Sequence, residues 1–170
     1  IESLSGWSAI QTGGGYAVVK SNQISLAFSD ASHSVFRRNT GSYGAAQYAK
    51  IKVTDLGGAV GSRLAIGVVT QCSADTGANR DCYTWWHDTF TNTAKLDKVV
   101  NGTEYTIDSR SLSLSANETI SLESNTNGAL ICYVNDVQVF STTDDGSSYG
   151  GAVLSGGAPG VLIRGYALAP

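Results

Sequence analysis

Residues 130–140 read LICYVNDVQVF and carry the pattern of a complete β-hairpin. Every second residue from Leu130 to Val134 is apolar, which places these side chains on one face of an extended strand. Asn135-Asp136 follows, and both residue types tolerate the positive φ angles of a two-residue turn. The segment therefore predicts two antiparallel strands with a buried face.

The same two-residue period recurs along most of the chain. Apolar residues alternate with others at 24–28, 49–53, 64–68, 105–107, 112–114, 120–122 and 161–163. Asn101-Gly102 separates two further runs and is the strongest short-range hairpin signal. About a dozen short strands predict one all-β domain spanning residues 1–170, with antiparallel sheets in a sandwich or barrel.

Composition narrows the function classes. Hydrophobic residues make up 42% of the chain, which argues against intrinsic disorder. The net charge of −3 and the scarcity of clustered Lys and Arg argue against a nucleic-acid partner. Since no apolar run approaches the roughly 20 residues of a membrane helix, we expect no membrane span.

Six segments follow one another in a familiar order: Trp7, AQYAKIKV at 46–53, LAIGVVT at 64–70, YTWW at 83–86, the hairpin at 130–140 and SGGAPGV at 155–161. In order and spacing the chain resembles the concanavalin A-like and laminin-G-like jelly rolls of bacterial and phage surface proteins and carbohydrate-binding modules. The resemblance covers nearly the whole chain. It implies a two-sheet antiparallel β-sandwich, but not one function, because this scaffold hosts lectins, enzymes and structural repeats.

One departure from that family concerns calcium. Many relatives hold a structural calcium between their first residues and an acidic residue of the last strand, but residues 161–168 contain no carboxylate. Asp144-Asp145, at the start of the Gly-rich segment 144–160, offers two hard oxygen donors instead. We expect no other cofactor, and a solvated pair of side chains is the alternative to calcium there.

The cysteines bear on the cellular compartment. Cys72 and Cys82 flank a polar segment, 73–81, that reads as a loop joining two strand ends, so a disulfide between them is expected. Such a bridge implies an oxidising, extracellular location or the surface of a cell or virion. The alternative is two free thiols. Cys132 lies on the apolar strand face and is predicted to be a buried thiol.

Two sequons start at Asn101 and Asn117 and would accept N-glycans in an organism that makes them. The chain begins at Ile1 rather than Met, as expected of a processed mature protein or an excised piece of a longer one.

Catalytic patterns are largely missing from the sequence. A glycosidase needs two carboxylates facing one cleft, and none of the four Glu has an acidic residue two positions away. Glu104 and Asp108 would lie roughly 13 Å apart along a strand, which is too far. Nucleophile-elbow and phosphate-binding motifs are absent from the sequence as well. We therefore expect a protein that is not an enzyme.

An aromatic strand is the strongest functional feature. Tyr83, Trp85 and His87 share one strand face, and Arg80 and Asp88 lie close by in the sequence. Flat aromatic rings can stack on the C–H faces of sugar rings while charged groups hold the hydroxyls. These five residues are the predicted ligand-binding site, on a face expected to be exposed.

The opposite assignment of this strand stays open. Trp86 shares the other face with Thr84 and Asp88, so either tryptophan could be the core residue.

Three functional hypotheses follow. The first is a non-catalytic extracellular module that binds polysaccharide through the aromatic face. The second is a structural subunit of an extracellular filament, surface layer or phage fibre, which would bind other copies of itself through strand or edge contacts. The third and least favoured is a polysaccharide lyase, because lyases of this fold pair a His with a Tyr, as His87 and Tyr83 could.

Overall fold

The computed structural model describes residues 6–12, 17–20, 23–26, 32–56, 62–73 and 79–167. These ranges form thirteen strands: β1 (Trp7–Thr12), β2 (Ala17–Lys20), β3 (Gln23–Leu26), β4 (Ser32–Arg38), β5 (Gln47–Lys52), β6 (Ser62–Cys72), β7 (Cys82–Asp88), β8 (Thr93–Val100), β9 (Thr103–Ser111), β10 (Thr119–Ser124), β11 (Ala129–Val134), β12 (Val137–Thr143) and β13 (Ala158–Ala167). Within the described ranges, no helix has the length and apolar character needed to cross a membrane.

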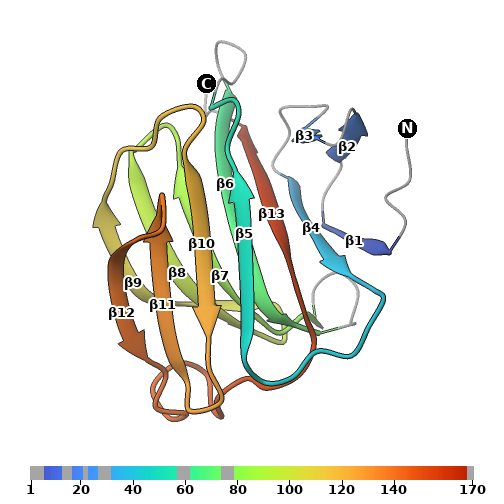
Figure 1. Ribbon diagram of the computed structural model, residues 1–170, viewed down its shortest axis with the longest axis vertical. Helices are drawn as coiled ribbons and strands as arrows, with labels where there is room; N and C mark the ends of the chain where they lie inside the picture. The colour runs from blue at the N-terminus through green and yellow to red at the C-terminus, as the bar shows by residue number, and fades with distance from the viewer. Residues whose placement is uncertain are drawn as a thin grey trace.

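Two antiparallel sheets form the sandwich that the sequence predicts. The large sheet has the strand order β1-β4-β13-β6-β7-β8-β9, and the small sheet has the order β12-β11-β10-β5. Figure 1 shows the small sheet lying across the large one, with the separate β2-β3 pair to the side of β4. We call the two facing surfaces the inner faces and the opposite surfaces the outer faces.

Both predicted two-residue turns are confirmed. Asn101 and Gly102 have φ angles of 48° and 77° and connect β8 to β9. Asn135 and Asp136 have φ angles of 51° and 63° and connect β11 to β12. Positive φ at both central residues matches the twist of the flanking strands, and this explains why Asn, Asp and Gly occupy these positions.

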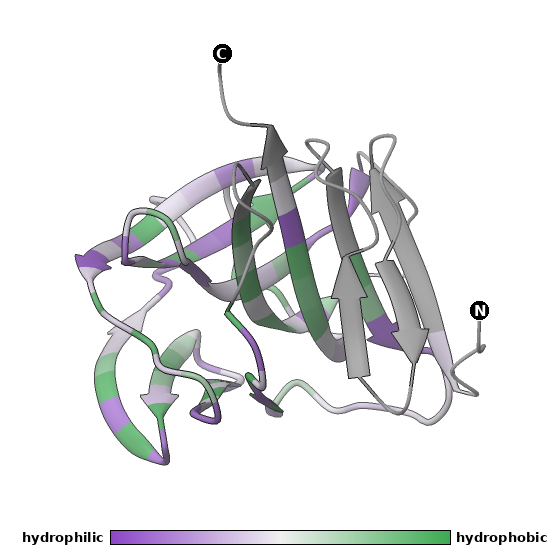
Figure 2. Cartoon of the chain, turned by 90° about the horizontal axis from the view of Figure 1, so that it is seen from above, coloured by the Kyte–Doolittle hydropathy of each residue, from purple (hydrophilic) through white to green (hydrophobic). Residues whose placement is uncertain are grey.

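The core lies between the inner faces, to which alternate residues of each strand contribute. Leu96, Leu122 and Leu130 are fully buried there. Cys132 is also fully buried, as the sequence predicts. Figure 2 shows hydrophilic and hydrophobic bands following each other along the strands, as a two-residue period requires.

A second buried cluster lies on the outer face of the large sheet. It consists of Val35, Ala65, Val69, Cys72, Cys82, Trp86, Val99 and Leu162. As a result, every residue of β7 is buried, whichever face its side chain occupies.

One predicted strand is wrong. The alternation of Leu112 and Leu114 suggested a strand, but β9 ends at Ser111 and this segment is irregular. The Leu112 N–H donates to the Asn92 carbonyl, and the Leu112 carbonyl lies 2.7 Å from Nε2 of His87. These contacts tie the segment to β7 and the turn after it while Leu114 fills the core.

Gly67 of β6 lies opposite Trp86 of β7, where the two strands leave no room for a side chain. A Cβ atom at Gly67 would lie 2.5 Å from the Trp85 carbonyl oxygen and 2.6 Å from the Trp86 Cβ. We expect Gly67→Ala to lower the free energy of unfolding by about 1–3 kcal/mol, because neither contact can yield without moving β7. Gly44→Ala is the matched control, since nothing lies within 4 Å of its Cβ position. Urea unfolding would measure both, and equal stability of the two variants would contradict the packing described.

Candidate functional site

The predicted binding face of β7 is not exposed, so this expectation is wrong. Tyr83, Trp85 and His87 point to the inner face, where 1%, 1% and 2% of their surface is exposed. The Trp85 ring meets the Phe140 ring edge-on, at 5.3 Å between centroids. Trp85 belongs to the apolar layer between the two sheets, so the small sheet covers this face of β7.

Trp86 lies on the outer face of β7, as the open alternative allowed, but it is buried too, with 3% of its surface exposed. Its Nε1–H donates a hydrogen bond of 2.6 Å to Oδ2 of Asp97 on β8. The guanidinium carbon of Arg164 lies 4.8 Å from the ring centroid, and Nζ of Lys95 lies 5.4 Å from it. The indole thus has a carboxylate at its edge and two cations over its ring.

Glu104 of β9 joins this group through arginines. The two nitrogens Nη1 and Nη2 of Arg164 reach the two Glu104 carboxylate oxygens at 3.1 and 2.5 Å, a bidentate pair. Nη2 of Arg80, from the segment before β7, lies 3.7 Å from Glu104. Arg80 therefore reaches the site, although not on the face that the sequence analysis favoured. The Glu104 side chain is one-third exposed and connects the group to solvent.

We call Trp86, Asp97, Arg164, Glu104 and Arg80 the outer-face cluster. Four of these residues were not predicted as site residues: Trp86, which was left as the alternative, Glu104, which was considered only as a catalytic carboxylate and rejected, and Asp97 and Arg164, which were not considered. Arg164 interrupts the apolar run of residues 161–163 in the last strand, and that interruption was the available signal. Asp97 and Glu104 come together only because β8 pairs with β9, which no spacing along one strand reveals.

Buried polar atoms in and beside the cluster lack partners. Oδ1 of Asp97 and Oγ1 of Thr84 are inaccessible, and neither forms a hydrogen bond of good geometry with any part of the chain that the structure describes. Burial raises the pKa of the Asp97 carboxyl, and its contacts with Trp86 and Thr106 only partly oppose this effect. An unsatisfied buried polar group costs about 1–3 kcal/mol, so both oxygens would gain from a hydrogen-bond partner, but none can reach them unless the cluster opens.

Asp88, also predicted as a ligand contact, has a local structural role. Its Oδ1 accepts the backbone N–H groups of Phe90 and Thr91 at 3.0 and 3.3 Å. These bonds close the turn that follows β7.

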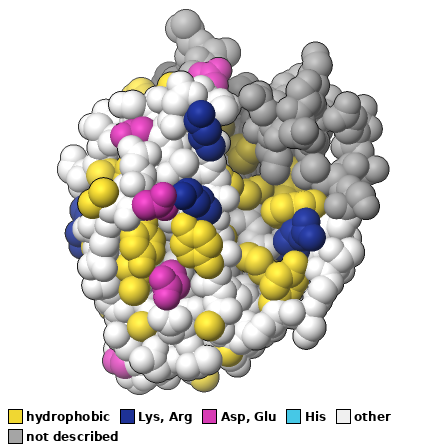
Figure 3. All heavy atoms as spheres, viewed as in Figure 1, with side chains coloured by type: hydrophobic (Ala, Val, Ile, Leu, Met, Phe, Trp, Pro, Cys, Tyr) yellow, Lys and Arg dark blue, Asp and Glu magenta, His cyan; other side chains and the backbone are white. Residues whose placement is uncertain are grey.

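The outer face of the small sheet carries tyrosines that were not predicted as ligand contacts. Tyr48 is 49% exposed, and the Tyr133 hydroxyl donates to Oε2 of Glu123 at 3.1 Å. Lys50 forms an ion pair of 2.6 Å with Asp136 on the same face. Figure 3 shows hydrophobic side chains on this side of the molecule interspersed with charges of both signs.

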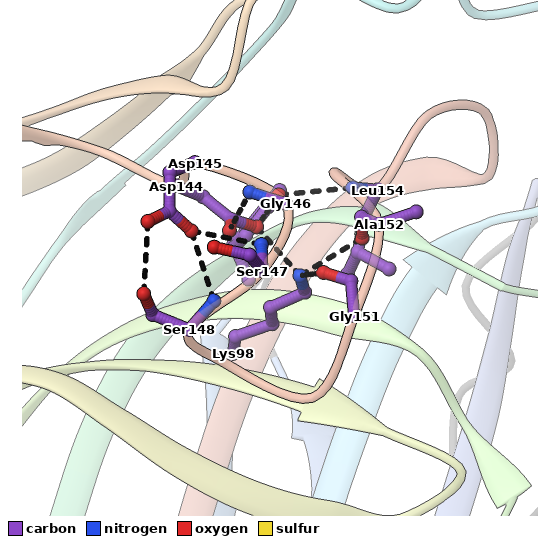
Figure 4. Close-up of polar contacts among 10 residues, drawn as sticks. Lys98, Asp144, Asp145, Gly146, Ser147, Ser148, Gly151, Ala152 and Leu154 are labelled. Carbon is purple, nitrogen blue, oxygen red and sulfur yellow. Dashed lines mark hydrogen bonds and ion pairs between the residues drawn. The ribbon is translucent and has the colours of Figure 1, made fainter.

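The predicted calcium pair separates into two environments. The Asp144 carboxylate is fully buried and lies 2.7 Å from Nζ of Lys98. Asp145 is exposed, and its carboxylate accepts the N–H groups of Ser147 and Ser148, which lower its pKa. Figure 4 shows these contacts. The two carboxylates therefore have separate partners.

The lyase pair is also engaged elsewhere. The Tyr83 hydroxyl donates to Oδ2 of Asp144 at 2.6 Å and accepts the Leu154 N–H at 2.9 Å, while burial raises its pKa. His87 contacts the Leu112 carbonyl. Neither side chain reaches solvent, where a polysaccharide would bind.

Cys72 and Cys82 are free thiols in the structure, and both are fully buried. A hydrogen bond between the two thiols lowers the pKa of Cys72 and raises the pKa of Cys82. The expected bridge is thus not formed in this structure, although the two sulfurs are neighbours. Asn101 and Asn117 are exposed, as acceptors of glycans must be.

Comparison with known proteins relates the chain to solved structures alone. No family model and no curated protein sequence matches it. A carbohydrate-binding module, CBM66 from Bacillus subtilis, is similar with 18% identity and a TM-score of 0.64, over 95% of this chain and 92% of the module. The exoplasmic/lumenal domain of VIP36, in a Ca²⁺/Man2-bound form, is 9% identical with a TM-score of 0.57, over 97% and 76%.

The transglycosylase Crh5 in its apo form is 12% identical with a TM-score of 0.52, over 97% of this chain and 64% of the enzyme. These likenesses confirm the predicted fold, an all-β sandwich of the concanavalin-like jelly-roll type. At such identities they establish the fold and not the activity.

Burial of His87 makes stability depend on pH. Burial lowers the pKa of this side chain, more than its contact with Leu112 and the charge of Asp88 raise it. In the unfolded chain His87 takes up a proton near pH 6.5, whereas in the folded chain it does so only at lower pH. The contribution of neutral His87 to the free energy of unfolding is therefore complete above about pH 6.5 and is lost as the pH falls.

We expect His87→Gln to lose less stability than the parent protein between about pH 7 and about pH 5 in urea unfolding. The difference between the two proteins isolates His87, since other groups titrate in both. Parallel pH profiles would contradict the assignment.

Proposed function

We propose that this chain is a non-catalytic module that binds a carbohydrate at the outer-face cluster. The observation that carries the proposal is the indole of Trp86, which donates to Oδ2 of Asp97, beside two buried oxygens, Oδ1 of Asp97 and Oγ1 of Thr84, that form no hydrogen bond of good geometry with the described residues. An apolar ring surrounded by a few fixed polar groups is the usual composition of a small-ligand site. The carbohydrate-binding module and the Man2-bound domain of VIP36, which share the fold, support the same ligand class.

Each part of the cluster has a role in this proposal. The Trp86 indole is 3% exposed and Asp97 is 1% exposed, so they form the base of the site, and a sugar would reach them from the side of the cluster where Glu104 is one-third exposed. Arg80 and Arg164 hold Glu104 in place. A ligand would approach from the exposed side of Glu104.

The same geometry argues against hydrolysis. Asp97 and Glu104 lie on one face of neighbouring strands, and a raised pKa on one of two carboxyls is a feature of glycosidases. Both Glu104 oxygens, however, are bound by Arg164, so this carboxylate is a poor base or nucleophile. We therefore propose binding without turnover, and release of reducing ends from any bound polysaccharide would contradict this.

An extracellular location belongs to the same proposal, with Cys72 and Cys82 joined in a disulfide and the sequons at Asn101 and Asn117 available. The contact between the two thiols supports the bridge. Intact mass after alkylation of the unreduced protein distinguishes two bonded cysteines from three free ones.

The assembly hypothesis is favoured by one observation. Strand β9 is an edge of the large sheet, and most of its nine residues are exposed. Such an edge can accept a strand from another copy. Light scattering that shows concentration-dependent polymers, together with no binding to any glycan, would favour this second function.

A glycan array followed by calorimetry tests the carbohydrate site. We expect Asp97→Asn, which keeps the side-chain shape, to weaken binding by about tenfold or more, because it removes the carboxylate that would accept a hydrogen bond from a sugar hydroxyl. Trp86→Ala should abolish binding, with circular dichroism as a check of folding. Tyr48→Ala and Tyr133→Ala, on the other sheet, are the matched controls.

Full binding by the outer-face cluster variants, with loss in the tyrosine variants, would move the site to the small sheet and overturn this assignment.

A further inference from the structure

Lys98 is a charged side chain in the core. It lies on the inner face of β8, opposite Tyr83 of β7, and none of its side chain is exposed. Asp144, which follows β12 directly, is equally buried. Since burying one charge alone would be prohibitively costly, the two groups must be understood together.

The Lys98 ammonium is surrounded by oxygen atoms of one loop. Its Nζ lies 2.7 Å from Oδ2 of Asp144, 2.7 Å from the Gly151 carbonyl oxygen and 2.8 Å from the Ala152 carbonyl oxygen. Three oxygens match the three N–H donors of an ammonium. A carboxylate with two inward-turned backbone carbonyls is also the kind of donor set that holds a small cation.

The rest of the loop closes around this centre. Oδ1 of Asp144 accepts the Gly146 N–H at 3.0 Å, and Oδ2 also accepts the Tyr83 hydroxyl. The Leu154 N–H donates to that same hydroxyl. Figure 4 shows the backbone of residues 144–154 turning around the end of the Lys98 side chain. One ammonium therefore organises both ends of the loop.

We infer that residues 144–154 form a cation site whose permanent occupant is the Lys98 ammonium. The calcium predicted from Asp144-Asp145 does not fit this arrangement. The Asp144 carboxylate and the two carbonyls already surround a positive charge, and the Asp145 carboxylate caps Ser147 and Ser148. The ligand class of the site is a primary ammonium or a monovalent cation of similar size, and the inference is independent of the proposed carbohydrate site.

Shortening Lys98 tests the inference, because it should empty the site. We expect Lys98→Ala to lower the melting temperature by on the order of 10 °C, since Asp144 then stays buried without a countercharge. Added n-propylammonium replaces the missing atoms and should raise the melting temperature of this variant with a saturating concentration dependence. n-Propanol, which has the same chain without the charge, should not.

Matched variants separate a site from a general salt effect. Lys98→Met fills the space without charge, and we expect it to be destabilised but not rescued by n-propylammonium. Lys95→Ala removes a lysine from the other face of the same strand and should keep close to parental stability. Equal stabilisation of all variants by n-propylammonium, or no loss of stability in Lys98→Ala, would overturn the inference.

Two measurements on the parent protein keep the test decisive if Lys98→Ala does not fold. Nitrogen-15 NMR should detect slowly exchanging ammonium hydrogens at Lys98, because all three are hydrogen-bonded away from water. Calcium and a chelator should leave the melting temperature of the parent protein unchanged. A fast-exchanging Lys98 ammonium, or a calcium-dependent gain in melting temperature that Asp144→Asn abolishes, would overturn the inference.

Discussion

The pleat of β7 is the constraint on which the rest of the structure depends. Successive side chains of a strand point to opposite faces, and both faces of β7 are buried. Trp85 on one side joins the two sheets by packing against Phe140, whereas Trp86 on the other side is bound to Asp97 and lies beneath Arg164. A shift of one residue in the pairing of β7 would turn Trp85 out of the core and bring Thr84 or Trp86 into it. The packing between the sheets therefore also fixes which residues of β7 reach the outer-face cluster.

The fold could be predicted from the sequence because its signals are local. Alternation and two-residue turns act over a few residues, so Asn101-Gly102 and Asn135-Asp136 identified their hairpins correctly. The segment with Leu112 and Leu114 shows the limit of the same signal. Alternate apolar residues also occur where an irregular segment fills a core, and the partners that hold this one, the Asn92 carbonyl and the His87 ring, come from elsewhere in the chain.

The candidate site could be predicted only in part because it depends on pairing between distant segments. Adjacent tryptophans had to lie on opposite faces, but nothing along β7 decides which face a second sheet covers. Arg80 was identified by its closeness in sequence to β7, whereas Asp97, Glu104 and Arg164 meet through the pairing of β7, β8 and β9 and through the place of β13 in the sheet. The Asp144-Asp145 pair illustrates the converse, since neighbours in sequence can face different surroundings, one toward Lys98 and one toward solvent.

An ammonium on a side chain differs from a bound ion in that it cannot dissociate. The covalent chain keeps the Lys98 ammonium at the loop whatever the medium contains. The stability of residues 144–154 therefore does not change with the concentration of free ions, whereas the stability of a loop held by a bound metal does. Acidic polysaccharides sequester divalent cations, and a metal-dependent module working among them would compete with its surroundings for its own structural ion. With Lys98 as the cation, this chain would keep the loop ordered in the presence of such polymers, in chelating media and during folding before any ion is encountered.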